Sequence, residues 1–159
     1  MIQLYHFTPT RSLAQILAQG LDPSYARGNP RLLWACDYAR AQWAFEHVAE
    51  CHGVRPWALS LLTFRFSEER LAAFSMPGVY RTGWMIGKAL LTHLPLYSLR
   101  EVARQTGIAN STLQYWLSAG WIAGSLTAKG VHMFSPLDIA DVRACQGQIK
   151  ANREAGLSR

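Results

Sequence analysis

The stretch SLREVARQTGIANSTLQYWLSAGWI, residues 98–122, contains the signals of two short helices joined by a tight turn. Ser98 and Glu101 have the spacing of a capping box, in which each side chain accepts a hydrogen bond from the other residue's backbone N–H. Gly107 suits the turn because glycine adopts positive φ at little cost. We expect Asn110 to cap the second helix. Apolar residues recur at helical spacing in both segments: Leu99, Val102, Ala103, Leu113, Trp116 and Leu117. The stretch therefore predicts a helix-turn-helix.

A β-hairpin and a third helix are expected after this motif. Residues 123–133 contain two glycines and Lys129 between apolar flanks, a pattern typical of a small hairpin wing. Ser135, the following proline and Asp138 then predict the start of a third helix, which continues through Val142. A short three-helix domain with a wing follows from this order of elements.

These elements resemble the MerR-type winged helix-turn-helix family and the related excisionase-like DNA binders. The resemblance covers residues 97–145 and rests on the E-V-A-x-x-T-G-I turn, the T-L-x-Y-W segment, the G-W-I step and the G-V-H-M-F-S end of the wing. It implies DNA binding, with the second helix in the major groove. The residues it places at base edges or phosphates are Asn110, Ser111, Thr112, Gln114 and Tyr115, and those it places near the phosphate backbone or in the wing are Arg100, Arg104, Lys129 and His132. Gln114 and His132 stand where the family usually has arginine.

The character of the sequence changes near residue 96, so we expect two domains, residues 1–96 and 97–159. Half of the 159 residues are apolar, which suffices for packed cores, and the net charge of +6 suits an acidic partner such as DNA. The three cysteines show no C-x-x-C spacing, which favours a reducing cytoplasm over a disulfide framework. No apolar run has the length of a membrane span, and the first residues lack the basic start of a secretory signal. We therefore expect a cytoplasmic protein with no membrane partner.

The first half mixes strands and helices. A strand is expected at residues 2–7, and Thr8-Pro9 is expected to start a helix that ends at Gly20. Asp37 is expected to cap a second helix from Tyr38 to about Cys51. Further strands are expected at residues 32–35, 57–66, 73–75 and 79–84. The pattern predicts an α+β domain with mostly antiparallel pairing.

This order of elements resembles the ADP-ribosyltransferase-like superfamily over about residues 1–95. The matching motifs are a strand ending L-Y-H-x-T, a helix ending I-L-x-x-G-L, and a short strand L-L-W-A before a second helix. The resemblance implies a split antiparallel sheet whose cleft holds NAD in a bent form. It gives His6 and Thr8 hydrogen-bonding roles toward NAD and gives Trp34 a stacking role on the nicotinamide. Tyr38 is a second aromatic candidate.

The carboxylate that such a transferase uses has no counterpart in the expected place. Breaking the nicotinamide–ribose bond develops positive charge, which a nearby anion stabilises, yet residues 75–99 contain no acidic residue. Glu68 and Glu69 are the nearest carboxylates, and we expect them in a solvated turn. Arg81 or Arg11 can hold a phosphate instead, as in the RNA 2′-phosphotransferases of the superfamily. Three alternatives remain: ADP-ribose transfer by another route, phosphate chemistry, and nucleotide binding without turnover.

Structural roles compete with each chemical one. His6 at a strand end can be a satisfied structural group, and Trp34 can be a core residue. The helical spacing of His47, Cys51 and His52 lacks a fourth ligand, so we expect no metal site. A hydrolytic pair of Cys36 and His6 lacks an identifiable orienting residue.

Two functional hypotheses follow from the two resemblances. The first is a DNA-associated ADP-ribosyltransferase-like protein, such as a toxin, that binds NAD and transfers ADP-ribose to a nucleic acid or a DNA-bound protein. The alternative is a non-enzymatic MerR-like regulator whose first domain senses a ligand or mediates assembly. A third interpretation makes the helix-turn-helix a protein-interaction module. A dimer is compatible with all three.

Overall fold

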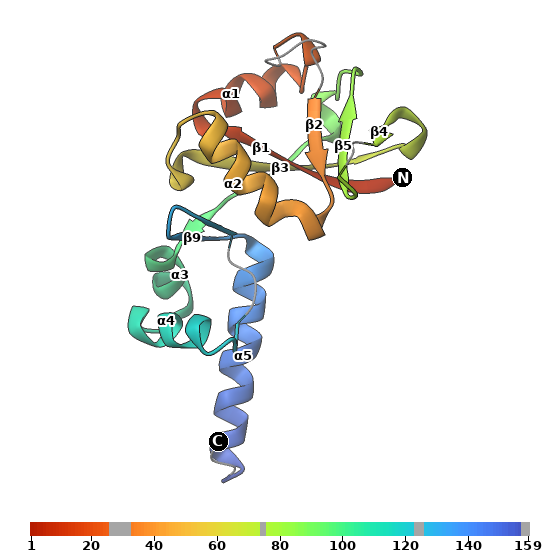
Figure 1. Cartoon of the computed structure of the whole chain (residues 1–159). Coiled ribbons are helices and arrows are strands. Elements are labelled where there is room, and N and C mark those ends of the chain that lie inside the picture. Colours follow the sequence, from red (N-terminus) through yellow and green to blue (C-terminus); the bar gives the residue numbers. More distant parts are fainter. Residues whose placement is uncertain (26–32, 74–75, 123–125, 157–159) are drawn as a thin grey trace.

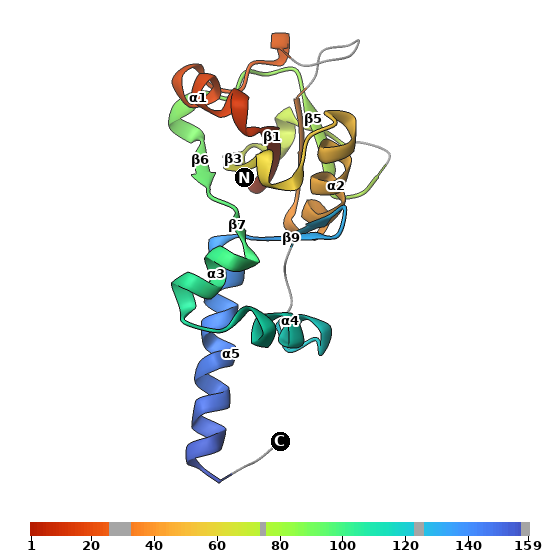
Figure 2. The ribbon, with the colours of Figure 1, turned by 90° about the vertical axis from the view of Figure 1, so that its left-hand side faces the viewer.

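The computed structural model describes residues 1–25, 33–73, 76–122 and 126–156. The fold is α+β: a six-stranded antiparallel sheet with two helices is followed by three helices and a three-stranded sheet (Figure 1). Both views show the six-stranded sheet at one end of the molecule, and the last helix, α5 (Pro136–Glu154), runs past α4 (Asn110–Ser118) away from it (Figure 2). No helix in the described part of the chain has the length and apolar character needed to cross a membrane.

The first sheet is antiparallel throughout, where the sequence predicted mostly antiparallel pairing. Its strands lie in the order β4-β5-β2-β1-β3-β6. Their bounds are β1 (Ile2–Pro9), β2 (Leu33–Cys36), β3 (Leu59–Phe66), β4 (Ala72–Ala73), β5 (Val79–Thr82) and β6 (Thr92–Leu94). The sequence did not predict β6, because its short apolar pattern is interrupted by His93. Leu32 and Phe74–Ser75, which were expected in strands, lie outside the described residues.

The central strand β1 is paired unequally on its two sides. It pairs with β3 along eight positions, from Ile2 opposite Phe66 to Pro9 opposite Leu59. It shares with β2 the one position at which Tyr5 lies opposite Cys36. The sheet therefore opens between β1 and β2 within the described residues.

The two faces of this sheet have separate cores because side chains alternate along a strand. Tyr5 and Phe7 face α2 (Ala41–Cys51), and the Phe7 ring packs edge-on against Phe45 with centroids 5.4 Å apart. Leu4, with Leu62 and Phe64 of β3, lies in the core on the other face, against which α1 (Thr10–Gln19) packs. Each helix thus covers one face of the sheet.

The starts of the first two helices differ in how well the sequence predicted them. Thr8 and Pro9 were expected to begin α1, but both remain in β1, where Thr8 lies opposite Ser60, and the helix starts at Thr10 without a side-chain cap. The ladder with β3 holds these residues extended. Asp37 does accept a hydrogen bond from the Arg40 N–H at 3.1 Å. It opens a 3-10 turn that leads into α2.

The second half contains the predicted helix-turn-helix and wing. Its elements are β7 (Tyr97–Ser98), α3 (Leu99–Thr106), α4, β8 (Leu126–Ala128), β9 (Val131–Phe134) and α5. The strands form the sheet β7-β9-β8. One buried cluster joins the three helices: Val102, Ile108, Leu113, Trp116, Ile122, Phe134, Ile139 and Val142. Residues 123–125, expected at the start of the wing, lie outside the described residues.

Two capping boxes fix helix starts in this half. The Ser98 N–H donates to the Glu101 carboxylate at 2.7 Å, and the Glu101 N–H donates to the Ser98 hydroxyl at 3.4 Å. Ser135 and Asp138 repeat the arrangement at α5, with distances of 2.6 and 3.4 Å. Asn110 does not cap α4 as expected: it is the first helical residue, since the Leu113 N–H already bonds to the Ala109 carbonyl.

The two halves share a core. Ala128 and Met133 of the wing lie in the same buried cluster as Phe7 and Phe45 of the first half. The wing strand β8 accordingly lies against α2. The wing is thus held by the first half as well as by its own helices.

Candidate functional site

The outer face of α4 carries polar side chains. Leu113 and Trp116 are buried and hold the helix on the core. The opposite face therefore exposes a row of the residues that the sequence placed at DNA: Asn110, Ser111, Gln114 and Tyr115 are exposed, and Thr112 is half-buried. This row has the composition and the exposure that base-edge contacts require.

Tyr115 is held in place at this surface although it is 56% exposed. Its ring meets Trp121 edge-on with centroids 5.3 Å apart. Its carbonyl accepts a hydrogen bond from the Ser118 hydroxyl at 2.9 Å. A fixed aromatic beside polar side chains suits contact with a sugar, a phosphate or a thymine methyl group.

The cations of this half lie on α3 and at the wing tip. Arg100 and Arg104 are exposed on α3. Lys129 and Gly130 form the two-residue connection of the hairpin, with φ of 50° and 74°, as in a type I′ turn. His132 is half-buried, and its Nδ1 lies 3.1 Å from the Thr127 hydroxyl across the hairpin. His132 therefore supports the hairpin, whereas Lys129 is displayed at its tip.

Two short helices joined at Gly107 in a left-handed conformation, followed by a small antiparallel wing, define a winged helix-turn-helix domain. Residues 97–156 match the model of the MerR HTH family of regulatory proteins. The match confirms the resemblance of the second half to the MerR-type helix-turn-helix. No curated protein and no solved structure matches the chain. The resemblance of residues 1–95 to the ADP-ribosyltransferase-like superfamily has no support from these comparisons and stays a prediction.

His6 lies on β1 beside the opening of the first sheet. Its Nδ1 is 2.6 Å from the backbone carbonyl of Trp34 on β2. Because a carbonyl only accepts hydrogen bonds, Nδ1 carries the proton and donates it. Burial lowers the pKa of His6 and outweighs the opposing effect of this hydrogen bond. The imidazole is therefore neutral at pH 7.

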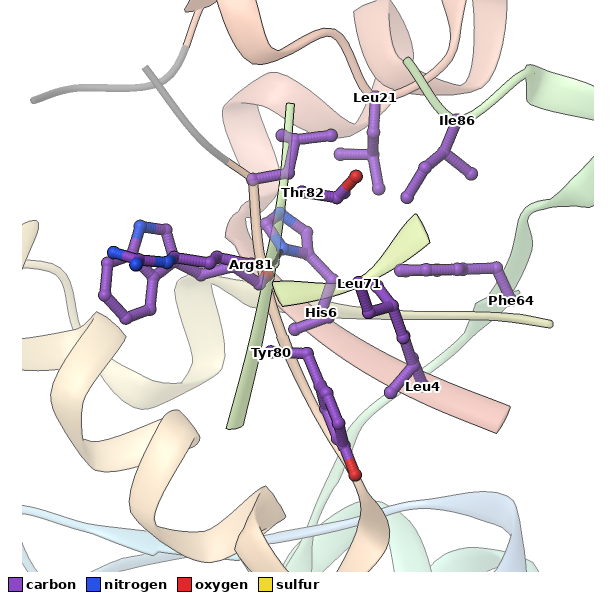
Figure 3. Close-up of a pocket in the computed structure, with 12 residues that line it drawn as sticks. Leu4, His6, Leu21, Phe64, Leu71, Tyr80, Arg81, Thr82 and Ile86 are labelled. Atoms are coloured by element: carbon purple, nitrogen blue, oxygen red, sulfur yellow. Dashed lines mark hydrogen bonds between the residues drawn. The ribbon is translucent and has the colours of Figure 1, made fainter. Parts of the chain in front are cut away.

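The rings of His6 and Trp34 lie on opposite faces of the sheet. Trp34 and Arg81 are opposite each other in the β2–β5 ladder, and strand alternation puts both on the face of Cys36 and Val79. His6 shares the other face with Leu4. Figure 3 shows Arg81 directed away from His6 and its neighbours. The structure thus joins His6 to the backbone of Trp34 and separates their side chains.

The hollow beside His6 is small. Its lining includes three predicted site residues, His6, Trp34 and Arg81, together with Leu71, Tyr80 and Thr82 (Figure 3). It has no room for a water molecule. Thr8 is buried and is not among the described residues that line it. Tyr38 lies near α2, its ring 5.6 Å from that of Tyr5. Within the described part of the chain, His6, Trp34 and Arg81 thus line one narrow hollow, whereas Thr8 and Tyr38 do not line it. Their roles toward a nucleotide stay a prediction.

The remaining candidates for chemistry are two glutamates, Cys36 and the possible metal ligands. Glu68 and Glu69 are exposed in a 3-10 turn, as expected. Burial raises the pKa of the Cys36 thiol to about 12, and its Sγ lies 3.7 Å from the Tyr5 carbonyl. It is thus a protonated core group on the face opposite His6. No group of three or more His, Cys, Asp and Glu side chains in the described ranges is arranged to hold a metal ion.

Two residues that the sequence did not single out for function lie where the halves meet. The Gln42 side chain on α2 donates to the Thr127 carbonyl at 2.6 Å and accepts from the Thr127 N–H at 2.8 Å. Asp138 is buried at the start of α5, where it lines one cavity together with Tyr38 of the first half. The capping pattern at Ser135 pointed to Asp138 as a helix residue only. No local pattern marks a residue whose partner lies 85 positions away.

Proposed function

We propose that the chain is a DNA-binding transcriptional regulator whose second half contacts duplex DNA through α4 and the wing. The observation that carries the proposal is the exposed polar face of α4, in a domain of MerR type that also exposes cations on α3 and at Lys129. Phosphate contacts from these cations would set the position of the domain on the duplex, and the α4 side chains would distinguish bases.

The first half acts on the DNA-binding half through the wing in this proposal. Gln42 bonds to both backbone groups of Thr127, and Met133 is buried in the core of the first half. A change in the first half therefore reaches the hairpin that carries Lys129. This supports a regulator whose first half senses a ligand or mediates assembly.

The experiment is selection of duplexes from a random-sequence pool by the full chain, followed by fluorescence anisotropy of a selected duplex. We expect specific binding that weakens steeply as salt rises, because bound cations displace counterions from the phosphates. Failure to retain any duplex at about 50 mM salt would overturn the proposal. Binding of equal strength to every sequence would support DNA binding but contradict the role of a sequence-specific regulator.

Binding of NAD or a related nucleotide by the first half is the second candidate. The observation that favours it is the opening of the sheet between β1 and β2, with the neutral His6 beside it. The separation of His6 from Trp34 and the narrow hollow count against it. Isothermal titration with NAD on the parent chain and on His6→Ala tests it. Heat released by the parent alone supports a nucleotide site, and no heat from either rejects NAD as the ligand.

A further inference from the structure

A cavity of about 180 Å³ lies between the two halves of the molecule. The first half contributes Tyr5, Tyr38 and Gln42 to its walls. The second half contributes Leu126 of the wing and Asp138 of α5. Ligand sites occur preferentially between domains, where two independent surfaces meet. This cavity has that position.

The volume and the apolar walls fit one small ring. An apolar cavity of roughly 150 Å³ suffices to bind benzene in another protein, so this cavity accommodates a six-membered ring with a short substituent. Tyr5 and Tyr38 form an aromatic wall with centroids 5.6 Å apart and planes tilted by 58°. Leu61 and Leu94 add aliphatic surface. Aromatic rings pack favourably in such tilted arrangements.

The polar part of the wall includes the Asp138 carboxylate, which forms no ion pair with a described basic side chain. Asp138 is the ionisable carboxyl group among the described lining residues, and it is 3% exposed. It accepts a hydrogen bond from the Ser135 N–H at 2.6 Å, and Tyr38 lines the same cavity. In the part of the chain that the structure describes, no basic side chain lies within ion-pair distance of it. A buried carboxylate gains most from a charged donor, because burial costs it the hydration that water supplies.

We infer that this cavity binds a single-ring aromatic or heterocyclic amine, with the ring against Tyr5 and Tyr38 and the ammonium group donating to Asp138. The inference rests on the proposed function for its regulatory meaning, because it gives the first half a ligand to sense. The ligand chemistry itself rests on the cavity alone.

Occupancy of the cavity bears directly on the wing. Leu126 lines the cavity, and its neighbour Thr127 is bonded to Gln42, which also lines it. An amine in the cavity therefore lies beside Gln42, one partner of the link, and beside Leu126, the chain neighbour of the other partner. A ligand shifts a conformational equilibrium by its difference in affinity for the two states. Contact with lining residues of both halves supplies that difference in affinity.

The test uses the full chain with benzylamine as the probe and benzyl alcohol as the uncharged analogue. We expect benzylamine at about ten times its Kd to raise the melting temperature by roughly 3–6 °C, with a matching heat in isothermal titration. Benzyl alcohol should bind at least about tenfold more weakly, because its hydroxyl carries no charge.

Three variants show whether the cavity is the binding site. Asp138→Asn keeps an oxygen for the Ser135 N–H but removes the charge, so it should abolish the preference for the amine. Leu137→Trp narrows the cavity from a position that is 53% exposed, where the larger side chain is tolerated, and should abolish binding of both probes. Glu154→Gln, at the far end of the same helix and exposed, is the matched control and should bind like the parent.

Each outcome bears on the site or on the proposed function separately. Absence of heat and of a melting shift with benzylamine overturns the site, as does equal binding by the parent, Asp138→Asn and Leu137→Trp. If the amine binds and the DNA Kd changes by about fivefold or more, the site is an effector site. Amine binding with an unchanged DNA Kd overturns the effector role. Amine binding by a chain that binds no duplex overturns the proposed function and leaves the ligand site standing.

Discussion

Gln42 and Thr127 form a two-hydrogen-bond pair in which a side-chain amide takes the place of a neighbouring strand. The Gln42 amide N–H bonds to the Thr127 carbonyl at 2.6 Å, and its oxygen accepts from the Thr127 N–H at 2.8 Å. Thr127 lies opposite His132 in the wing ladder, so the pair fixes the free edge of β8. An exposed strand edge otherwise invites pairing with other chains. The pair both protects that edge and sets the position of the wing on α2.

Replacement of Gln42 by alanine should loosen this attachment. The two backbone groups of Thr127 then pair with water, and we expect the free energy of unfolding to fall by about 1–3 kcal/mol. Amide hydrogen exchange at Thr127 should accelerate together with the loss of stability. Gln148→Ala is the matched control, because Gln148 is exposed and bonds only to Asn152 on its own helix in the described structure. Equal effects of the two variants in urea unfolding would contradict the role of the pair.

The exposed face of α4 should determine sequence specificity. Gln114→Ala removes a side chain suited to a bidentate contact with adenine, and loss of such a contact raises the Kd for the selected duplex by roughly 5- to 150-fold. The melting temperature should not change, because Gln114 is exposed. Anisotropy titrations of the selected duplex and of a scrambled duplex measure the effect. Gln146→Ala on the exposed surface of α5 serves as the control, and an equal loss there would remove α4 from the interface.

The sequence predicted the second half well because its signals are local. The capping boxes at Ser98 and Ser135 and the left-handed Gly107 require only residues within a few positions, and all three are present. The error at Asn110 has a local cause as well: Ala109 already provides the first carbonyl of α4, so the helix starts at Asn110. Short-range chemistry of this kind shifts a boundary without altering the fold.

The first half was harder to predict because its geometry is set by pairing between distant residues. The motif around His6 and the strand around Trp34 were identified, but the face on which each side chain lies depends on strand register. With Tyr5 opposite Cys36, the rings of His6 and Trp34 fall on opposite faces. The cavity between the halves was missed for the same reason, since Tyr38 and Asp138 line one space only in the folded chain.

Arg100 and Arg104 should account for part of the salt dependence of DNA binding. Each cation that neutralises one phosphate contributes about 0.9 to the slope of log K against log salt. Arg100→Ala and Arg104→Ala should each lower the magnitude of the slope by about that amount, on specific and scrambled duplexes alike. Arg153→Ala, at the far end of α5, is exposed and should leave the slope unchanged. An unaltered slope in both α3 variants would place the phosphate contacts elsewhere.

His6 should make the fold less stable as the solution is acidified. Burial lowers the pKa of His6 in the folded chain below its ordinary value of 6.5. Below that pH the unfolded chain takes up a proton at His6 that the folded chain does not, so the free energy of unfolding falls as pH decreases from 6.5 to the folded-state pKa. The loss is at most about 1.4 kcal/mol per pH unit.

His6→Gln keeps a donor for the Trp34 carbonyl but cannot titrate, so its stability should fall less between pH 7 and pH 5. Urea unfolding at pH 5, 6, 7 and 8 measures both chains, and the difference between them isolates His6 because their other titrating groups are the same. Parallel pH curves for the two chains would show that the imidazole is not desolvated in the folded state.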